Sequence, residues 1–599
     1  MDVEGVPVFF AEAPEPFLAA LMFRVGRADE TLRDGGLTHL VEHLALSSIP
    51  RGTYQYNGLV EAAVTTFYAS GSRGEVLEHV AAVAAALREP PLDRLDAEKR
   101  ILMAEASTTG PSLYARLMAL RFGPVGYGLV HYAELGLGWL TRDDVAEWSQ
   151  RRFTTANAAL WLTGEPPARL DFGLPDGRTR PPPAPDPIPT LDFPCELAEG
   201  TGGVALSLLP ERSTAVHAAF MIAVERAHRR LRQGAALSYA PTGSYVPLDG
   251  RFVHLVLNAD CRDQEASGVR DELLRIVDEL AEHGPTEEEL EWDRTMLEQA
   301  LRDPYWAPGK LDSSARDTLM SVRTLTREEL RRERAELTGD AVAAALGGGL
   351  ASLLVLTPSR TPMTRRRQLA EFAPQNRNPV SGRRYPVSTE WQEWQEKSEL
   401  VVGSTGFSYV RTDPSEVCSW NFPDCIAAIR LLSGALTVVG RDGSFVTLYP
   451  HRYRSGDEAV GAIERALGDE LFVPLTGREQ ELAPIVRRDL EARLGRVARE
   501  VDALPDVLGT TEDLRRVAEA RRGHQVGLVA VTDRRLLFLF LGTYENELFE
   551  KPLDEISEAC VKGLLTKRLV VSHGAETTEF HDVEPAARIS ELQSLLSAS

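Results

Sequence analysis

The 599-residue chain contains few cysteines and no long apolar run. Its five cysteines are scattered and odd in number, which predicts reduced thiols in the cytoplasm rather than a disulfide framework. No run approaches the ~18–20 apolar residues that a membrane-spanning helix needs. The N-terminal residues lack the basic and apolar regions of a secretory signal, so we expect a soluble, cytoplasmic protein.

Basic residues are outnumbered by acidic ones, 66 against 88, and the net charge is -22. A nucleic-acid-binding protein needs a basic face to neutralise phosphates, so the composition argues against a nucleic-acid partner. Apolar residues make up 43% of the chain, which is ordinary for globular proteins. At ~150 residues per domain, the length predicts about four domains.

Two proline-rich segments divide the first 390 residues of the sequence. Proline cannot continue a helix or a central strand, so residues 166–193 and the basic segment 359–387 are predicted to be linkers. They separate two units of similar size, residues 1–165 and 194–358.

These two units have the same coarse pattern. Each opens with apolar, strand-like segments, Phe17–Val25 in the first and Val204–Leu209 with Ala218–Val224 in the second. Each closes with a Leu-Thr-Arg helix start, where threonine precedes an acidic first turn, and then an apolar strand. A duplicated α+β unit is therefore predicted.

The pattern changes from about residue 388, where short strands alternate with turns. Residues 388–470 and 516–599 each contain strands followed by one helix, and a charged helical connector covers residues 471–515. This order predicts two small β-barrels, each capped by a helix.

The strongest motif is His39-Leu40-Val41-Glu42-His43. Histidines at positions i and i+4 lie one above the other on a helix face, where one zinc ion can bind both. Glu42 is placed to take a proton from a metal-bound water, whose pKa zinc lowers to about 7. The alternative is a helix whose histidines merely lie at its surface.

A catalytic zinc needs a third protein ligand and one open position. Glu98 and Glu105 are seven residues apart, so both lie on one face of a predicted helix. We assign Glu105 as the third ligand, with His39 and His43. Glu98 is then a carboxylate behind the ligands that orients one of them or sets the local charge.

These residues resemble the M16, or insulinase-like, metallopeptidases, the family of pitrilysin and mitochondrial processing peptidase. The likeness covers about residues 1–358 and includes a Gly-x-x-x-Glu turn from Gly26 to Glu30 and the family's Gly-x-x-His-x-x-Glu-His motif from Gly36. It implies two α/β sandwich domains and one zinc ion. The segment between the metal helix and Glu105 is shorter than in the family, and a missing helix there would reshape one wall of the site.

The resemblance also implies substrate-binding residues. In the family an edge strand binds the peptide as an additional strand, and Asn57 and Gly58 match it. An Asn-Gly turn is the alternative. Arg232 and Tyr239 match two family residues that bind the substrate carbonyl or its oxyanion. A surface arginine and a core tyrosine are the alternative.

The C-terminal modules resemble bacterial pleckstrin-homology-like (PH-like) domains, most clearly at Val529–Phe538. Such a resemblance implies no catalysis. It implies a weak contact with acidic lipid or protein, although exposed basic residues are usually just solvated. The candidate basic face consists of Arg534, Arg535, Lys562, Lys567 and Arg568.

Together these features predict a zinc-dependent metalloendopeptidase that hydrolyses short or unfolded peptides. The family encloses its chamber with four such units, and this chain has two, so a homodimer or a paired M16 subunit is implied. Two alternatives remain open. One is an inactive M16-like peptide-binding or interaction protein, and the other is a peptidase dedicated to one precursor.

Overall fold

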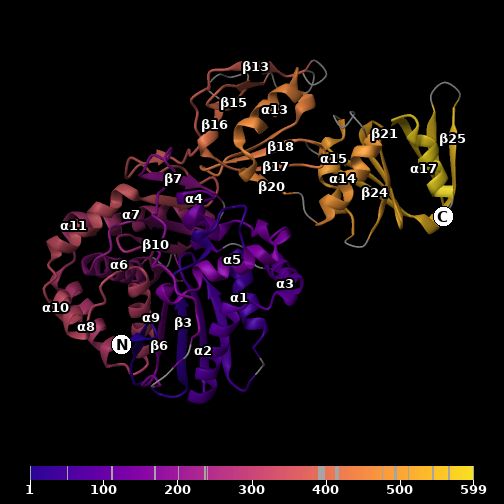
Figure 1. Cartoon of the computed structure of the whole chain (residues 1–599). Helices are drawn as coiled ribbons and strands as arrows, with labels where there is room; N and C mark the ends of the chain where they lie inside the picture. Colours follow the sequence, from indigo (N-terminus) through magenta and orange to yellow (C-terminus); the bar gives the residue numbers. More distant parts are fainter. Residues whose placement is uncertain are drawn as a thin grey trace. The chain divides into compact units, whose positions relative to one another are not determined.

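The structure, a computed structural model, forms two compact units, shown in Figure 1. Unit 1 comprises Met1–Pro374 with Arg441–Gly443, and unit 2 comprises Gln375–Gly440 with Ser444–Ser599. The structure describes residues 2–49, 52–108, 112–167, 170, 172–199, 202–234, 238, 240–388, 398–411, 417–474, 477–490, 496–509, 512–542, 546–563 and 567–597.

The first half of unit 1 is built on a six-stranded sheet in the order β1-β2-β6-β3-β5-β4. Strand β2 runs parallel to β6, and the other pairs are antiparallel. Its strands are β1 (Asp2–Val3), β2 (Val6–Phe10), β3 (Phe17–Phe23), β4 (Gln55–Val60), β5 (Thr65–Gly71) and β6 (Ala158–Leu162). Strand β4 is therefore an edge strand, which leaves its outer backbone groups without a partner strand in this sheet.

Both faces of this sheet are covered. In the central strand β3, Leu21 and Phe23 belong to the core under the helices, and Met22 belongs to a second core on the opposite face. This alternation is the period of two that strand geometry imposes. The helix α1 contacts α2, α3 and α5. The helices are α1 (Leu37–Ser47), α2 (Arg73–Arg88), α3 (Leu95–Thr108), α4 (Leu113–Phe122) and α5 (Arg142–Arg152).

The second half of unit 1 repeats this topology, with the strand order β12-β7-β11-β8-β10-β9. Strands β7 and β11 are parallel, as β2 and β6 are, and β8, β10 and β9 pair antiparallel, as β3, β5 and β4 do. The strands are β7 (Cys195–Ala198), β8 (Gly203–Leu208), β9 (Thr242–Pro247), β10 (Val253–Asp260), β11 (Leu354–Thr357) and β12 (Ala370–Glu371). The predicted duplication of an α+β unit is confirmed.

The helices of the second half also correct one prediction. The segment Ala218–Val224 is not a strand but part of α6, because a serine N-cap at Ser213 starts a helix whose apolar residues fill the core. The helices are α6 (Thr214–Ala227), the π-helical turn η6 (His228–Gly234), α7 (Ala266–His283), α8 (Glu287–Arg302), α9 (Trp306–Leu319), α10 (Arg327–Ala335) and α11 (Gly339–Gly349).

The two predicted linkers, 166–193 and 359–387, are largely packed against unit 1 or built into a sheet. Phe172 is buried in the first core, and Ile188 is buried against α4 and the second sheet. Within 359–387, β12 joins the second sheet, Arg367 pairs with Asp278 of α7, and β13 (Arg383–Pro386) pairs with β14 of unit 2. Proline excludes helices and central strands, but it does not prevent extended chain from packing or edge strands from pairing.

Unit 2 begins with two four-stranded sheets, β13-β14-β15-β16 and β19-β18-β17-β20, around one core that includes helix α13 (Gly456–Leu467). The short strand β20 follows α13, so this module runs beyond the predicted end at residue 470. The strands are β14 (Glu399–Val402), β15 (Gly406–Val410), β16 (Val417–Asn421), β17 (Cys425–Arg430), β18 (Leu436–Gly440), β19 (Phe445–Leu448) and β20 (Phe472–Val473).

The last module is a seven-stranded antiparallel sheet, β24-β23-β22-β21-β27-β26-β25, followed by helix α17 (Arg588–Ser597). The predicted connector contains α14 (Gly477–Leu490), α15 (Ala498–Asp502) and α16 (Leu504–Val507), which share a core with β21 and β22. The strands are β21 (Leu514–Arg522), β22 (Gln525–Thr532), β23 (Arg535–Leu541), β24 (Asn546–Pro552), β25 (Ile556–Lys562), β26 (Arg568–His573) and β27 (Glu576–Glu584). The PH-like character of both modules stays a prediction.

The candidate basic face of this module is partly neutralised. Arg535 forms ion pairs with Glu512 and Glu550, and Arg568 pairs with Glu579. All five cysteines are free thiols. None of the helices in the described ranges combines the length and apolar character that crossing a membrane requires.

Candidate metal centre

Helix α1 carries the histidine motif, and its first turn is fixed by a buried carboxylate. Glu30 accepts hydrogen bonds from the backbone amides of Gly36, at 3.0 Å, and Thr38, at 2.7 Å. A carboxylate at a helix N-terminus satisfies amides that lack helical partners and complements the helix dipole. Trp148 Nε1 donates to the Thr38 hydroxyl at 3.2 Å. These contacts, with Leu40 and other apolar residues buried in the core, set which face of α1 is turned to the sheet.

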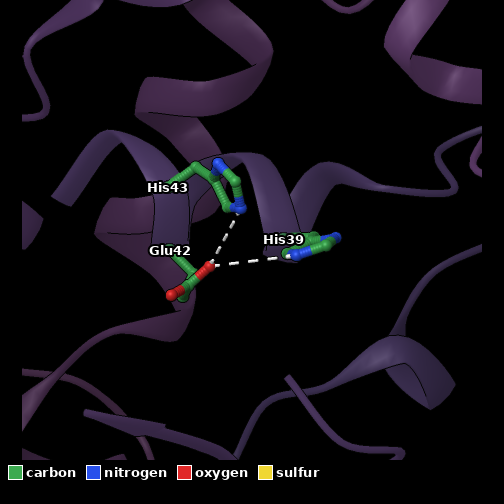
Figure 2. A group of neighbouring side chains, drawn as sticks. All are labelled: His39, Glu42 and His43. Atoms are coloured by element: carbon green, nitrogen blue, oxygen red, sulfur yellow. Dashed lines mark ion pairs between the residues drawn. The ribbon is translucent and has the colours of Figure 1, made fainter. Parts of the chain in front are cut away.

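His39, Glu42 and His43 converge on one side of α1, as Figure 2 shows. Oε2 of Glu42 lies 4.0 Å from Nε2 of His39 and 3.8 Å from Nε2 of His43. One ligand atom from each of the three residues lies within 4.8 Å of the others, and no other such group of three is found in the part of the chain that the structure describes. The imidazole side chains are 25% and 20% exposed, so an ion or a peptide can reach them.

Each imidazole has a carboxylate at its other nitrogen. Nδ1 of His39 lies 3.0 Å from Oε1 of Glu134, and Nδ1 of His43 lies 3.5 Å from Oε2 of Glu98. A carboxylate behind a histidine fixes the ring orientation and leaves Nε2 to bind a metal. The donor set therefore fits a zinc ion, which binds neutral imidazole and carboxylate.

Two arginines hold these rear carboxylates in place. Arg27 pairs with Glu134 at 2.7 Å, and Arg94 pairs with Glu98 at 2.8 Å. Glu134 directly precedes the short helix η4 (Leu135–Gly138). No sequence signal marked Glu134, because it is 95 positions from His39 and belongs to no periodic segment.

Glu105 also lies beside the histidines. Its Oε2 is 3.7 Å from Nε2 of His43, the ring nitrogen that faces Glu42. Glu98 and Glu105 thus both lie beside His43, in agreement with their predicted position on one face of α3. The Glu105 side chain is 53% exposed and lies outside the compact group of His39, Glu42 and His43. Its role as third ligand stays a prediction.

The environment shifts the proton affinities of these groups. Burial raises the pKa of Glu42 to about 7; the charge of His39 opposes this shift, and the negative charge of Glu105 adds to it. Burial also lowers the pKa of His43, together with the charge of His39. For His39, burial is outweighed by the hydrogen bond and charge of Glu134, and the pKa is raised. A carboxylate that titrates near neutral pH can both accept and return a proton.

Strand β4 passes directly beneath Glu42. A Cβ atom on Gly58 would lie 1.7 Å from Oε1 of Glu42, so only glycine allows this approach. Asn57 and Gly58 pair with Tyr68 and Phe67 of β5, so the alternative of an Asn-Gly turn is wrong. Their contact with a substrate stays a prediction.

Comparisons with known proteins bear on the fold. No family model matches the chain, and no curated protein matches it. Among solved structures, an inactive domain of an M16 peptidase from Pseudomonas fluorescens matches with a TM-score of 0.50 and 16% identity, over 61% of this chain and 98% of that one. A protease from Helicobacter pylori matches with a TM-score of 0.50 and 12% identity, over 60% of this chain and 98% of that one.

The matched part of this chain has an M16 peptidase-like fold. The second half of this fold lacks the equivalent motif. A Cβ on Gly243 of β9 would meet Phe220 of α6 at 2.5 Å, in the way that Gly58 of β4 meets Glu42 of α1. Gly243 pairs with Leu257 of β10, as Gly58 pairs with Phe67 of β5. A phenyl ring thus occupies in the second half the place that the Glu42 carboxylate occupies in the first.

Both predicted oxyanion residues belong to the second half of the chain. Arg232 is exposed in η6 of the second half. The carboxylates whose charges raise the pKa values of the two imidazoles, Glu42, Glu98, Glu105 and Glu134, all belong to the first half. Tyr239 lies outside the described residues.

Proposed function

We propose that this protein is a zinc-dependent endopeptidase that hydrolyses peptide bonds in short or unfolded peptides. The observation that carries the proposal is the orientation of the two imidazoles. Each has its Nδ1 beside a carboxylate, and their Nε2 atoms lie 4.0 and 3.8 Å from the same oxygen of Glu42. A surface pair of histidines would not need two rear carboxylates, each held by its own arginine.

In this proposal His39, His43 and Glu105 hold the zinc ion. When bound, the ion would lower the pKa of a water and polarise the substrate carbonyl. Glu42 would accept a proton from the attacking water and later give it to the leaving amine. Its buried carboxylate, with a pKa raised to about 7, is suited to hold a proton between these two transfers.

Strand β4 binds the substrate in the same proposal. Its outer edge accepts an extended peptide through main-chain hydrogen bonds, which are independent of the peptide's sequence. Gly58 brings the backbone of β4 against Glu42, so a peptide on this edge passes close to the acid–base group. Main-chain recognition requires an extended substrate, which favours short or unfolded peptides.

A homodimer, or a pairing with a second M16-like subunit, completes the site. The second half of this chain offers Arg232, and Tyr239 follows it by seven positions. A cation and a phenol directed at an oxyanion would stabilise the tetrahedral intermediate. We therefore propose that these two side chains serve the centre of a second copy. We also propose a reducing compartment, the cytoplasm, from the few and scattered cysteines.

A second candidate function is that of a protein with the same M16-like fold that binds peptides but does not hydrolyse them. The half-exposed position of Glu105, outside the compact group, favours it. A peptidase dedicated to one precursor would use the same residues as a general one and differ in substrate range.

Metal content and cleavage, measured together, test the proposal. The full chain is purified, its zinc is counted by mass spectrometry, and a mixture of unstructured peptides is offered. We expect about one zinc per chain and internal cleavage. Glu42→Gln should retain the zinc and lose cleavage by at least 100-fold, since a general base contributes about 10²–10⁴. Zinc-loaded wild type that binds peptides without cutting any would establish the binding protein instead.

A further inference from the structure

A cluster of three aromatic rings lies at the start of β4. Tyr54 and Tyr56 both pack on His79 of α2, with ring centroids 5.5 and 4.9 Å from the imidazole. The two tyrosine rings are 5.5 Å apart. The Tyr54 hydroxyl lies 3.2 Å from Nδ1 of His79, within hydrogen-bond distance. His79 is 2% exposed, so this cluster anchors the start of β4 to a buried group.

Further contacts hold the same segment on α2. The Thr53 hydroxyl donates to Glu75, and Glu75 also accepts from Ser72, the N-cap of α2. A Cβ on Gly71, at the end of β5, would lie 2.5 Å from Cβ of Tyr54, so the glycine leaves room for the tyrosine. Side-chain contacts with α2 and β5 therefore fix the residues that lead into β4.

Tyr56 shares a face of β4 with Gly58. Along the strand, Tyr56, Gly58 and Val60 are partly buried, and the residues between them are exposed. Side chains two positions apart in a strand lie on one face, at about 3.3 Å per residue. The ring of Tyr56 thus lies on the face that meets Glu42 at Gly58, about 7 Å further along the strand.

A peptide added to the free edge of β4 would place one residue opposite Gly58 and another, two positions away, opposite Tyr56. Directly opposed residues in a sheet point to the same face, and aromatic pairs across strands stabilise one another by about 0.2–1 kcal/mol. The side chain opposite Tyr56 therefore meets a phenol ring. The backing of that ring by His79 limits how far it can turn away.

We propose that Tyr56 is a specificity-determining residue that selects an aromatic side chain in the substrate, two positions from the residue over Gly58, and that His79 is its positioning residue. This inference rests on the proposed peptidase function. It names a preference that main-chain binding alone does not supply, because main-chain hydrogen bonds are the same for every residue.

Cleavage of a matched peptide series tests it. An unstructured peptide that the wild-type full chain cuts at one bond is varied singly, with phenylalanine or alanine at each of the three positions on either side. The readout is the ratio of kcat/KM for phenylalanine over alanine. We expect one position with a ratio of about 1.4 to 5, which corresponds to the energy of a cross-strand aromatic pair.

Variants of the cluster distinguish the selection of the substrate side chain by Tyr56 from the positioning of Tyr56 by His79. Tyr56→Ala should bring the ratio at that position to about one, and Tyr56→Phe should keep it. His79→Ala should raise the KM for the phenylalanine peptide more than it lowers kcat, and His79→Phe, which keeps an aromatic ring beneath Tyr56, should restore the preference. Tyr305→Ala, which removes a tyrosine that is 73% exposed in the second half, is the control and should leave the ratio unchanged.

The outcomes are distinct. A ratio that Tyr56→Ala leaves unchanged overturns the inference and leaves the peptidase function standing. A wild-type protein that cuts no peptide overturns the proposed function, and the inference falls with it. A preference lost equally in Tyr56→Ala and Tyr305→Ala would mean that the fold, not Tyr56, sets selectivity.

Discussion

Gly58 and Glu42 are in such close contact that a single methyl group on Gly58 would lie 1.7 Å from the Glu42 carboxylate. This contact joins two parts of the centre that come from different elements, the Glu42 carboxylate on α1 and the edge strand β4. The neighbouring carboxylate oxygen, Oε2, faces both histidines. The position of the strand thus determines where the carboxylate can lie.

Gly58→Ala should displace this carboxylate. We expect kcat to fall by about 10- to 100-fold, since a misplaced general base loses part of its contribution of about 10²–10⁴. The zinc content should stay at the wild-type level, because the atoms nearest to a Cβ on Gly58 belong to Glu42 and not to a histidine. Gly74→Ala is the control, since a Cβ there meets nothing within 4 Å. Full activity in Gly58→Ala would show that Glu42 needs no contact with β4.

Glu134→Gln tests the orientation of His39. The carboxylate lies 3.0 Å from Nδ1 of His39 and is itself held by Arg27. We expect zinc affinity, measured by competition with a chelator, to fall by about 10- to 100-fold, as for other outer carboxylates behind metal-binding histidines. Glu147→Gln removes an exposed carboxylate of α5 and should leave the affinity unchanged. Equal affinities for the two variants would exclude this role of Glu134.

The parts of the centre that the sequence predicted are local in the chain. His39, Glu42 and His43 lie in two turns of one helix, and Glu98 and Glu105 share a face of another, so residue spacing places each set on one helix face. That the two sets meet followed only from assigning Glu105 as a ligand of the same ion. Glu134 was missed because the link is formed by tertiary packing. The packing of the two predicted linkers was missed for a related reason: proline content predicts where regular structure ends, but not where extended chain contacts a core.

The strands of the C-terminal modules also depend on tertiary pairing that the sequence pattern does not predict. Strand β21 carries several arginines and begins at Leu514, inside the segment 471–515 that was predicted to be a helical connector. Val517, Ala518 and Ala520 are buried, and the pairing register with β22 shifts between Leu514 and Arg516. The buried residues therefore do not alternate regularly with exposed ones, and the sequence lacks the period of two that marks a strand. Pairing with β22 and β27 stabilises it as a strand in spite of its composition.

Glu105→Gln and Glu98→Gln should differ in their effect on zinc. If Glu105 is the third ligand, its amide variant should lower zinc affinity by more than about 100-fold, which exceeds the usual cost of losing an outer carboxylate. Glu98→Gln should lower the affinity less, since Glu98 lies beside Nδ1 of His43 rather than Nε2. The reverse order would exchange the two roles. Isothermal titration of zinc into the metal-free proteins measures both.

Acid should destabilise the second half of unit 1 through His254. Its imidazole is fully buried, beside the Ser207 hydroxyl at 2.8 Å, and burial, with the charge of Arg121, lowers its pKa to about 3. The unfolded chain binds a proton near pH 6.5, so stability is complete above that pH and declines as the pH falls towards 3. The decline from this one group would reach roughly 5 kcal/mol.

His254→Gln removes this titration and should flatten the acid dependence. The measurement is the urea midpoint at pH 7, 5 and 4, followed by tryptophan fluorescence and far-ultraviolet circular dichroism. We expect the wild-type midpoint to fall more between pH 7 and pH 4 than that of His254→Gln, even if the variant is less stable at pH 7. His283→Gln, at an exposed position, should follow the wild type. Parallel curves for wild type and His254→Gln would mean that His254 accepts a proton in the folded protein, and that the contact with Ser207 adapts to it.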